Sequence, residues 1–193
     1  MKIECKKENL LKGVSLVSKA SSSKGSLPIL SHILLETHNG RLRLSATDLE
    51  IGVTCIFGAH VEKEGKGAVP ARVLAEYLPT VSSEKIQIAE KEGVVTFGAH
   101  SGETKVNGQH ADEFPLIPSI NKSGDFTIEA DLLSYALSSV AFSVSRDIAR
   151  PEMSGVLMKV KDGVLFFAAT DGHRLSEYQV PLKDISFEGD VSI

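Results

Sequence analysis

The chain contains 193 residues, of which 42% are hydrophobic and 24% are charged, and its formal net charge at neutral pH is −4. These proportions are typical of an ordinary soluble globular chain and exclude a fibrous or a disordered one. The N-terminus begins with charged residues and has no apolar run long enough for a signal peptide or a membrane span, so we expect a cytoplasmic protein.

The two cysteines, Cys5 and Cys55, form no CxxC pair and have no histidine at metal-ligand spacing. We therefore expect both thiols to be reduced, and we expect neither a structural metal nor a cofactor.

The charge is distributed unevenly along the chain. Residues 1–25 contain six of the 21 basic residues and two of the 25 acidic ones, so the remainder of the chain is strongly acidic. A locally basic surface on an acidic protein is able to contact phosphate without holding it tightly. Charge alone favours the simpler interpretation, which is a solvated helix face.

Residues 8–19 predict the first helix, because apolar residues recur at helical spacing on one side. The members of this apolar face are Leu10, Val14 and Val17. The opposite face is polar and consists of Glu8, Lys12, Ser15 and Lys19.

Short β-branched or alternating segments, bounded by Gly, Asn, Asp or Ser, predict antiparallel strands joined by tight turns. These segments are residues 40–46, 51–57, 84–90, 93–99, 126–130 and 163–169.

Two further helices are predicted between the strands. Residues 69–78 place Pro70 in a first helical turn and Arg72 away from the apolar side, which consists of Val73, Leu74, Tyr77 and Leu78. Residues 131–144 begin at Asp131, a plausible N-cap, and their apolar side consists of Leu133, Leu137, Val140 and Val144. Residues 112–125 are rich in Pro, Asn, Ser and Gly, so they predict a linker.

The chain contains an internal repeat. A shift of 123 positions aligns residues 27–48 with residues 150–171 without a gap, and eight of the 22 aligned positions are identical. Each aligned segment also follows a predicted amphipathic helix. We therefore expect two copies of one domain type.

The repeat predicts the domain boundaries. The first copy covers residues 1–121, and the second covers residues 122–193, where it ends at the counterpart of Pro70. We therefore expect a second domain that lacks its second helix and its closing strands. Such a domain would have an unpaired strand edge, which is a liability for solubility.

Within the repeat, the two copies share Ala-Thr-Asp and then diverge. The shared residues after an apolar strand predict a turn, because Asp accepts hydrogen bonds from the N–H groups that follow it. The second copy alone has Gly172, His173, Arg174 and Leu175. The combination of Asp171 with His173 allows a small hydrolase, but the chain has no nucleophile elbow. A binding surface fits better, since Arg174 supplies a fork of donors beside apolar Leu175, with Thr170 and Met153 nearby.

Several motifs occur in a fixed order along the chain, at residues 27–36, 45–53, 69–72, 108–115, 150–158 and 168–175. The most specific of them is ATDGHRL, at residues 169–175. Together they resemble the bacterial DNA polymerase III beta subunit family, the replication sliding clamps, and the resemblance covers essentially the whole chain.

The resemblance implies an α+β DNA clamp fold, with repeated domains of antiparallel sheet and two helices each. Three such domains make one chain of the family, and two chains close into a homodimeric ring whose helices face duplex DNA. The family protein is a non-catalytic processivity factor that tethers the replicative polymerase and other proteins, and a clamp loader opens the ring. This chain would then lack the third domain and one side of the dimer interface, and we expect that it cannot close a ring alone.

The resemblance also assigns residues to sites. The positions that match DNA-facing or commonly basic ones are Lys12, Lys19, Lys24, Arg72, Arg146 and Arg150. The half of the partner pocket that belongs to the second domain, which takes a Gln-Leu-x-Leu-Phe-like peptide, would consist of Met153, Thr170, Gly172, His173, Arg174 and Leu175.

One motif departs from the family. Gln109-His110 stands where Leu-Pro is usual, which is a change in a loop. Two other functions stay open at this point: the hydrolase with Asp171 and His173, and an interaction protein built from repeats that has no connection with DNA.

Overall fold

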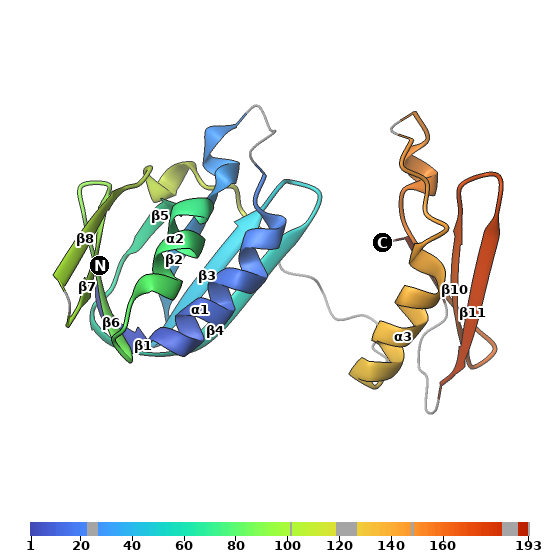
Figure 1. Cartoon of the computed structure of the whole chain (residues 1–193), viewed down its shortest axis with the longest axis horizontal. Coiled ribbons are helices and arrows are strands. Elements are labelled where there is room, and N and C mark those ends of the chain that lie inside the picture. Colours follow the sequence, from blue (N-terminus) through green and yellow to red (C-terminus); the bar gives the residue numbers. More distant parts are fainter. Residues whose placement is uncertain (23–26, 101, 119–126, 148, 183–188, 193) are drawn as a thin grey trace. The chain divides into compact units, whose positions relative to one another are not determined.

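The computed structural model describes residues 1–22, 27–100, 102–118, 127–147, 149–182 and 189–192 (Figure 1). The chain divides into two compact units, Met1–Pro118 and Ser119–Ile193, which we name unit 1 and unit 2. Lys24, one of the predicted basic site residues, lies outside the described residues.

Unit 1 contains an antiparallel sheet whose eight strands follow the order β5-β2-β3-β4-β1-β6-β7-β8. The strands are β1 Lys2–Lys6, β2 His32–His38, β3 Arg41–Thr47, β4 Gly52–Lys63, β5 Lys66–Pro70, β6 Lys85–Lys91, β7 Val94–Ala99 and β8 Gly102–Asn107. Its α-helices are α1 Lys7–Val17 and α2 Ala71–Tyr77. Short 3₁₀ helices occupy Ser18–Ala20, Pro28–Ser31, Leu78–Thr80 and Ala111–Glu113.

The two α-helices of unit 1 lie side by side on one face of this sheet (Figure 1). The predicted apolar face of α1 is confirmed, because Leu10, Val14 and Val17 are almost completely buried. They pack with alternating strand residues, among them Leu42 and Leu44. Burial of these side chains is the main force that holds α1 on the sheet.

The predictions for the other helices are partly wrong. Val73 is 41% exposed, because α2 is short and its buried side consists of Ala71 and Leu74, with Leu78 just beyond its end. Pro70 ends β5 and caps α2 instead of lying in its first turn. The third helix begins at Ala130, so Asp131 lies in its first turn and is not the N-cap.

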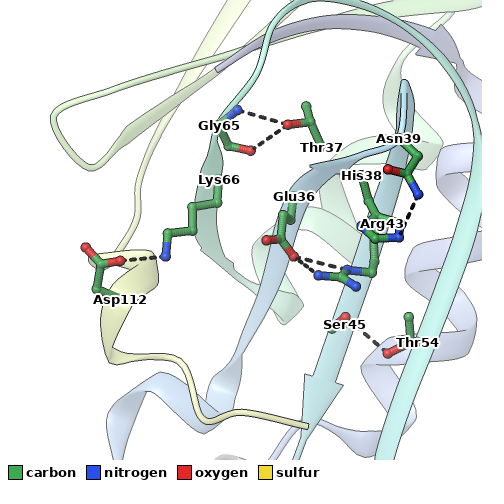
Figure 2. A network of polar contacts seen from close by, with 10 residues as sticks. All are labelled: Glu36, Thr37, His38, Asn39, Arg43, Ser45, Thr54, Gly65, Lys66 and Asp112. Carbon is green, nitrogen blue, oxygen red and sulfur yellow. Dashed lines mark hydrogen bonds and ion pairs between the residues drawn. The ribbon is translucent and has the colours of Figure 1, made fainter. Parts of the chain in front are cut away.

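The predicted linker is also wrong in its first part. Residues 112–118 belong to unit 1, where Phe114 is buried with Ile29, Leu30 and Ala68. The segment is also held by an ion pair between Lys66 and Asp112, with 2.5 Å between Lys66 Nζ and Asp112 Oδ1 (Figure 2). The buried Phe114 side chain and the ion pair hold this segment in place, although its composition alone predicts a linker.

Figure 2 also shows polar contacts on β2 and β3, the strands that follow β5 in the sheet. Arg43 on β3 pairs across the strands with Glu36 on β2, and its Nε lies 3.0 Å from Glu36 Oε2. Thr37 Oγ1 accepts a hydrogen bond from the Gly65 N–H, which fixes the turn that leads into β5. These cross-strand contacts help to set the register of the sheet.

Unit 2 has a four-stranded antiparallel sheet with the order β11-β10-β9-β12. Its elements are α3 Ala130–Ala141, a 3₁₀ helix Pro151–Met153, β9 Leu157–Lys161, β10 Val164–Thr170, β11 Leu175–Pro181 and β12 Gly189–Ser192. Its core is formed by α3 and the sheet, where Val140 packs with Leu165 and Phe167. The predicted strand 126–130 is wrong for its described part, because residues 127–129 belong to no strand and Ala130 begins α3.

The internal repeat is also present in the secondary structure. Adding 123 to the bounds of β3 gives the bounds of β10, and adding it to the start of α1 gives the start of α3. The hairpins also correspond, because Asn39-Gly40 and Asp162-Gly163 both have positive φ angles. Paired positive φ values are those of a type I′ turn, which matches the twist of two adjacent strands. The two units are therefore built on one local plan.

Candidate functional site

The segment Thr170–Arg174 is a tight turn between β10 and β11. Oδ1 of Asp171 accepts hydrogen bonds from the N–H groups of His173 and Arg174, at 3.0 Å and 2.9 Å. Thr170 Oγ1 accepts one from Gly172 N–H at 3.1 Å. The N–H group of Arg174, and after it that of His173, holds the pKa of the Asp171 carboxyl below its ordinary value.

Unit 1 contains the same turn. Asp48 Oδ1 accepts hydrogen bonds from Glu50 N–H and Ile51 N–H at 3.0 Å and 2.7 Å, and Thr47 Oγ1 accepts one from Leu49 N–H at 3.0 Å. The prediction that Ala-Thr-Asp forms a shared turn is thus confirmed. Since Asp48 forms this turn without a neighbouring His or Arg, the turn itself needs neither.

Arg174 is fixed from two sides. Its Nε donates to Asp171 Oδ2 at 2.9 Å, and its guanidinium carbon lies 5.6 Å from the centre of the Phe142 ring. Both carboxylate oxygens of Asp171 are therefore engaged, one by the turn and one by Arg174. Among the described contacts, Asp171 bonds to the turn and to Arg174 and not to the His173 ring, so the structure shows no oriented Asp–His pair of the kind that a hydrolase uses.

The loop that follows α3 is tied to the sheet beside this turn. Ser143 is buried, and its hydroxyl oxygen lies 2.7 Å from that of Ser176 on β11. Ser145 N–H donates to the carbonyl of Met153 at 2.9 Å. These bonds bring the end of α3, the loop after it and the turn together, although they are far apart in sequence.

Two hollows lie between these segments. The first, which we name the Phe142 hollow, measures about 630 Å³ and is lined by Ala141, Phe142, Val144, Ser145, Arg146, Asp171 and Arg174. The second, which we name the arginine hollow, measures about 440 Å³ and is lined by Ser145, Arg146, Asp147, Arg150, Asp171, Gly172 and His173. Because Ser145, Arg146 and Asp171 line both, the hollows adjoin.

Three of the six predicted pocket residues line these hollows, and the other three do not. Gly172, His173 and Arg174 line the hollows, whereas Met153, Thr170 and Leu175 are not among the described lining residues. Leu175 begins β11 and its side chain is 72% exposed, and Thr170 ends β10 and bonds within the turn. Met153 is half-buried in the 3₁₀ helix behind the loop.

Sequence reasoning missed Phe142 and Ser145. The sequence held a signal for Phe142, because its position does not fall on the apolar face of the preceding helix. In the structure Phe142 is 59% exposed. A single exposed aromatic side chain is common on protein surfaces, so what marks Phe142 is its place in a hollow beside Arg174.

The predicted basic residues occupy different places. Lys12 on α1 and Arg72 on α2 are exposed, and each pairs with an acid one helical turn away, Glu8 at 2.7 Å and Glu76 at 2.8 Å. Lys19 is exposed in the 3₁₀ helix after α1.

Arg146 and Arg150 lie in the loop after α3 and line the arginine hollow. Arg150 Nη1 lies 3.6 Å from the point where a side chain at Gly172 would begin. The structure thus places two residues predicted for DNA next to residues predicted for a partner peptide.

Other kinds of site find no support in the described part of the chain. No group of three or more His, Cys, Asp or Glu among the described residues is arranged to hold a metal ion. Cys5 and Cys55 are free, and burial raises the pKa of the Cys5 thiol to about 12. No described helix is long and apolar enough to cross a membrane.

Comparison with known proteins identifies the family. Residues 1–118 match the model of the DNA polymerase III beta subunit, N-terminal domain, and residues 127–193 match that of its central domain. The beta sliding clamps of Synechocystis sp. and Synechococcus elongatus are 32% and 34% identical to this chain, of which the matches cover 100% and 91%. They cover 52% and 48% of those proteins, so the chain spans about half the length of these relatives.

Solved structures agree with this result. The DNA polymerase sliding clamp from Bacillus subtilis matches all of this chain and 53% of its own, with a TM-score of 0.94 and 27% identity. A sliding clamp from Bartonella birtlesii, bound to griselimycin, matches 94% of this chain and 50% of its own, with a TM-score of 0.85 and 27% identity. The clamp fold and the family expected from the motifs are confirmed, and the chain belongs to the DNA polymerase III beta subunit family.

Proposed function

We propose that the chain acts as part of a DNA sliding clamp, a cytoplasmic processivity factor that encircles duplex DNA as a homodimer and tethers a polymerase and other proteins. The observation that carries this proposal is the match of both units, in order, to the first two domains of the beta subunit family. Residues 1–121 and 122–193 are then the first and second clamp domains. Its role is to bind and not to catalyse, which fits a turn whose Asp171 is occupied by structural bonds.

The helix face of unit 1 is the surface proposed for DNA. Lys12, Lys19 and Arg72 are exposed on or beside its two helices. Glu8 and Glu76 neutralise two of these cations, so the face attracts phosphate weakly. Weak contacts without sequence preference suit a protein that must slide, since phosphate contacts carry no sequence information.

The proposed partner site is the pair of hollows in unit 2, together with the exposed Leu175 and the neighbouring Thr170 and Met153. Phe142 and Leu175 offer apolar contact, while Arg174 offers donors that Asp171 holds in place. A surface with apolar area and a few fixed polar groups fits a short peptide with leucine and phenylalanine side chains. The clamp loader, the polymerase and other replication proteins would each present such a peptide.

A binding assay tests this site. A fluorescent Gln-Leu-Ser-Leu-Phe peptide with both ends capped should bind the chain, and Arg174→Ala should weaken binding by about threefold or more, since a bond to a charged group is lost. Arg41→Ala removes an exposed arginine of β3 in unit 1 and serves as the matched control, with no expected effect. Absence of binding at millimolar peptide, or an equal loss in both variants, would contradict the proposed site.

A further inference from the structure

The chain contains two Asn-Gly pairs, Asn39-Gly40 and Asn107-Gly108, and both lie in unit 1. Such a pair is chemically labile, because the backbone nitrogen of the glycine is able to attack the side-chain carbonyl carbon of the asparagine. Glycine has no side chain that would obstruct this approach. The reaction needs no enzyme, but the two groups have to meet, and the structure holds the two pairs in very different ways.

Asn39 and Gly40 form the tip of the hairpin between β2 and β3. Both residues are exposed, and a Cβ added at Gly40 would meet nothing within 4 Å. Among the described contacts, the Asn39 side chain has one partner, His38, with 3.3 Å between Asn39 Nδ2 and His38 Nε2 (Figure 2). The hydrogen bond of a tight turn joins the two residues that flank the tip, so the turn does not engage the Gly40 N–H. Little therefore holds this tip beyond the pairing of His38 with Arg41.

Asn107 and Gly108 are fixed by their neighbours. Asn107 ends β8 and pairs with Val94 on β7. The nitrogen that would attack belongs to Gly108, and its N–H already donates to Gly93 O at 2.8 Å. The space beside it is closed, since a Cβ added at Gly108 would lie 2.1 Å from the carbonyl oxygen of Ala68. This pair is able to react only after its segment has separated from β5 and from the turn before β7.

The backbone at the exposed tip sets the barrier to the reaction. The φ angles of Asn39 and Gly40 are 49° and 70°, which are those of a type I′ turn. In such a turn the ψ angle of the first central residue is about +30°, which directs the next nitrogen away from that residue's own side chain. The peptide bond between the two residues must therefore rotate before the attack. Loop tips open at little cost in free energy, whereas paired strands open at up to the cost of global unfolding.

We propose that Asn39 is a site of spontaneous deamidation in the folded protein, reached by opening of the β2–β3 hairpin tip, and that Asn107 is protected from it. Hydroxide removes the proton of the Gly40 N–H, and the nitrogen forms a bond with Asn39 Cγ. The bond between Cγ and Nδ2 breaks, and Nδ2 takes a proton from water and leaves as ammonia. Water then opens the cyclic imide at either carbonyl, which yields aspartate or isoaspartate at position 39.

The other hairpins indicate which product the fold accepts. Glu92-Gly93 and Asp162-Gly163 also have positive φ angles at both residues, so an acid fits the first position of this turn. An aspartate at position 39 should therefore leave the hairpin intact and add a negative charge beside the exposed Arg41. Isoaspartate instead carries the main chain through its side chain, and the extra backbone atom does not fit a two-residue turn.

Peptide mapping of the full chain tests the inference. The folded chain is kept at pH 8 in heavy-oxygen water and then digested with trypsin in ordinary water, so that only deamidation before digestion introduces the heavy isotope. Trypsin places the two pairs in separate peptides, residues 25–41 and 106–122, and fragment ions distinguish Asn107 from Asn121. Asn39 should convert at least about tenfold faster than Asn107, because a loop tip opens far more often than paired strands do.

Two controls separate the effect of the fold from that of the local sequence. The same chain unfolded in urea keeps both Asn-Gly pairs and loses their surroundings, so the two rates should become similar. Gly40→Ala places a side chain beside the attacking nitrogen and should remove most of the conversion at Asn39. Asn39→Asp represents the direct product, and its urea midpoint should equal that of the unmodified chain.

Two results would overturn the inference. Conversion of Asn39 in urea alone would show that the folded tip does not open far enough to react. Conversion of Asn107 in the folded chain as fast as that of Asn39 would show that the strands do not protect their pair. A clear loss of stability in Asn39→Asp would contradict the product that the other hairpins indicate. None of these measurements involves a peptide or DNA, so their outcome is independent of the proposed function.

Discussion

Leu49 and Gly172 occupy the same position in two copies of one turn, and both have a left-handed backbone, with φ angles of 80° and 86°. Glycine adopts this conformation freely, whereas a residue with a Cβ atom does so at a cost of roughly 1–2 kcal/mol. The turn of unit 1 is therefore strained at Leu49, and the turn of unit 2 is not strained at Gly172.

Replacing Leu49 with glycine should stabilise unit 1. The strain is relieved while the unfolded chain gains some freedom, so the net gain in unfolding free energy is about 0.5–1 kcal/mol. Urea unfolding of the chain measures it. Ile51→Gly, in the same turn but without a positive φ, should destabilise the protein, and equal effects of the two changes would show that Leu49 is not strained.

Gly108 should tolerate no side chain. It lies beside β5, where its N–H donates to Gly93 O at 2.8 Å, and an added Cβ would lie 2.1 Å from the carbonyl oxygen of Ala68. Because that oxygen belongs to the backbone, the segment at Gly108 would have to move away from β5, and Gly108→Ala should destabilise unit 1 by about 2–4 kcal/mol.

Gly58 is the matched control for Gly108, since a Cβ there meets nothing within 4 Å. Gly58→Ala should leave the urea midpoint unchanged or raise it slightly, because alanine restricts the unfolded chain. A small effect of Gly108→Ala, comparable with that of Gly58→Ala, would show that the loop before the 3₁₀ helix moves freely and would contradict the packing described here.

The sequence predicted where the three helices lie, but only the buried face of α1 was predicted fully, and the strands were predicted less completely. The periodic apolar residues of α1 identify its buried face, because a helix on a sheet must be apolar along one side. Strands such as β1 and β11 were missed, because polar or charged residues alternate with their inward-facing residues and weaken the apolar pattern. Phe114 shows the other limit: burial of one side chain orders a segment whose composition is typical of a linker.

The turn of the candidate site could be predicted from the sequence. The loop that packs beside this turn could not. The repeat separated the shared Ala-Thr-Asp from the residues that follow it, and the structure confirms that Asp171 organises the turn. The approach of Arg150 to Gly172 depends on the path of an irregular loop. That path is fixed by bonds such as Ser143 to Ser176, which no periodic pattern in the sequence indicates.

His32 should make unit 1 less stable in acid. Its ring is buried, and burial lowers its pKa from the ordinary value of 6.5, although a contact with the Pro28 carbonyl partly opposes this shift. The folded state thus binds a proton less readily than the unfolded state. The contribution of the neutral ring is fully present above pH 6.5 and is lost as the pH falls below it.

Urea unfolding at pH 7.5 and at pH 5 tests the role of His32. The wild-type chain should lose more unfolding free energy between these pH values than His32→Gln, which does not titrate. Equal losses in the two proteins would show that the ring is already solvated in the folded state.

The acids on the helix face should restrain DNA binding. Glu8→Gln and Glu76→Gln release Lys12 and Arg72 from their ion pairs, so each should strengthen binding of a short duplex by about two- to threefold at low salt. Lys12→Gln and Arg72→Gln should weaken it and reduce the salt slope by about one each. Fluorescence polarisation at several salt concentrations measures both effects, and unchanged affinity in all four variants would exclude this face.

The central claim is that two copies of one turn have diverged, so that only the copy in unit 2 binds a partner peptide. NMR titration of the isotope-labelled chain with capped Gln-Leu-Ser-Leu-Phe tests this claim most directly, because each turn reports in the same sample. Shifts should gather at residues 141–146 and 170–175, and residues 47–52 should stay unchanged. Equal shifts in the two turns, or shifts in neither at millimolar peptide, would contradict the account.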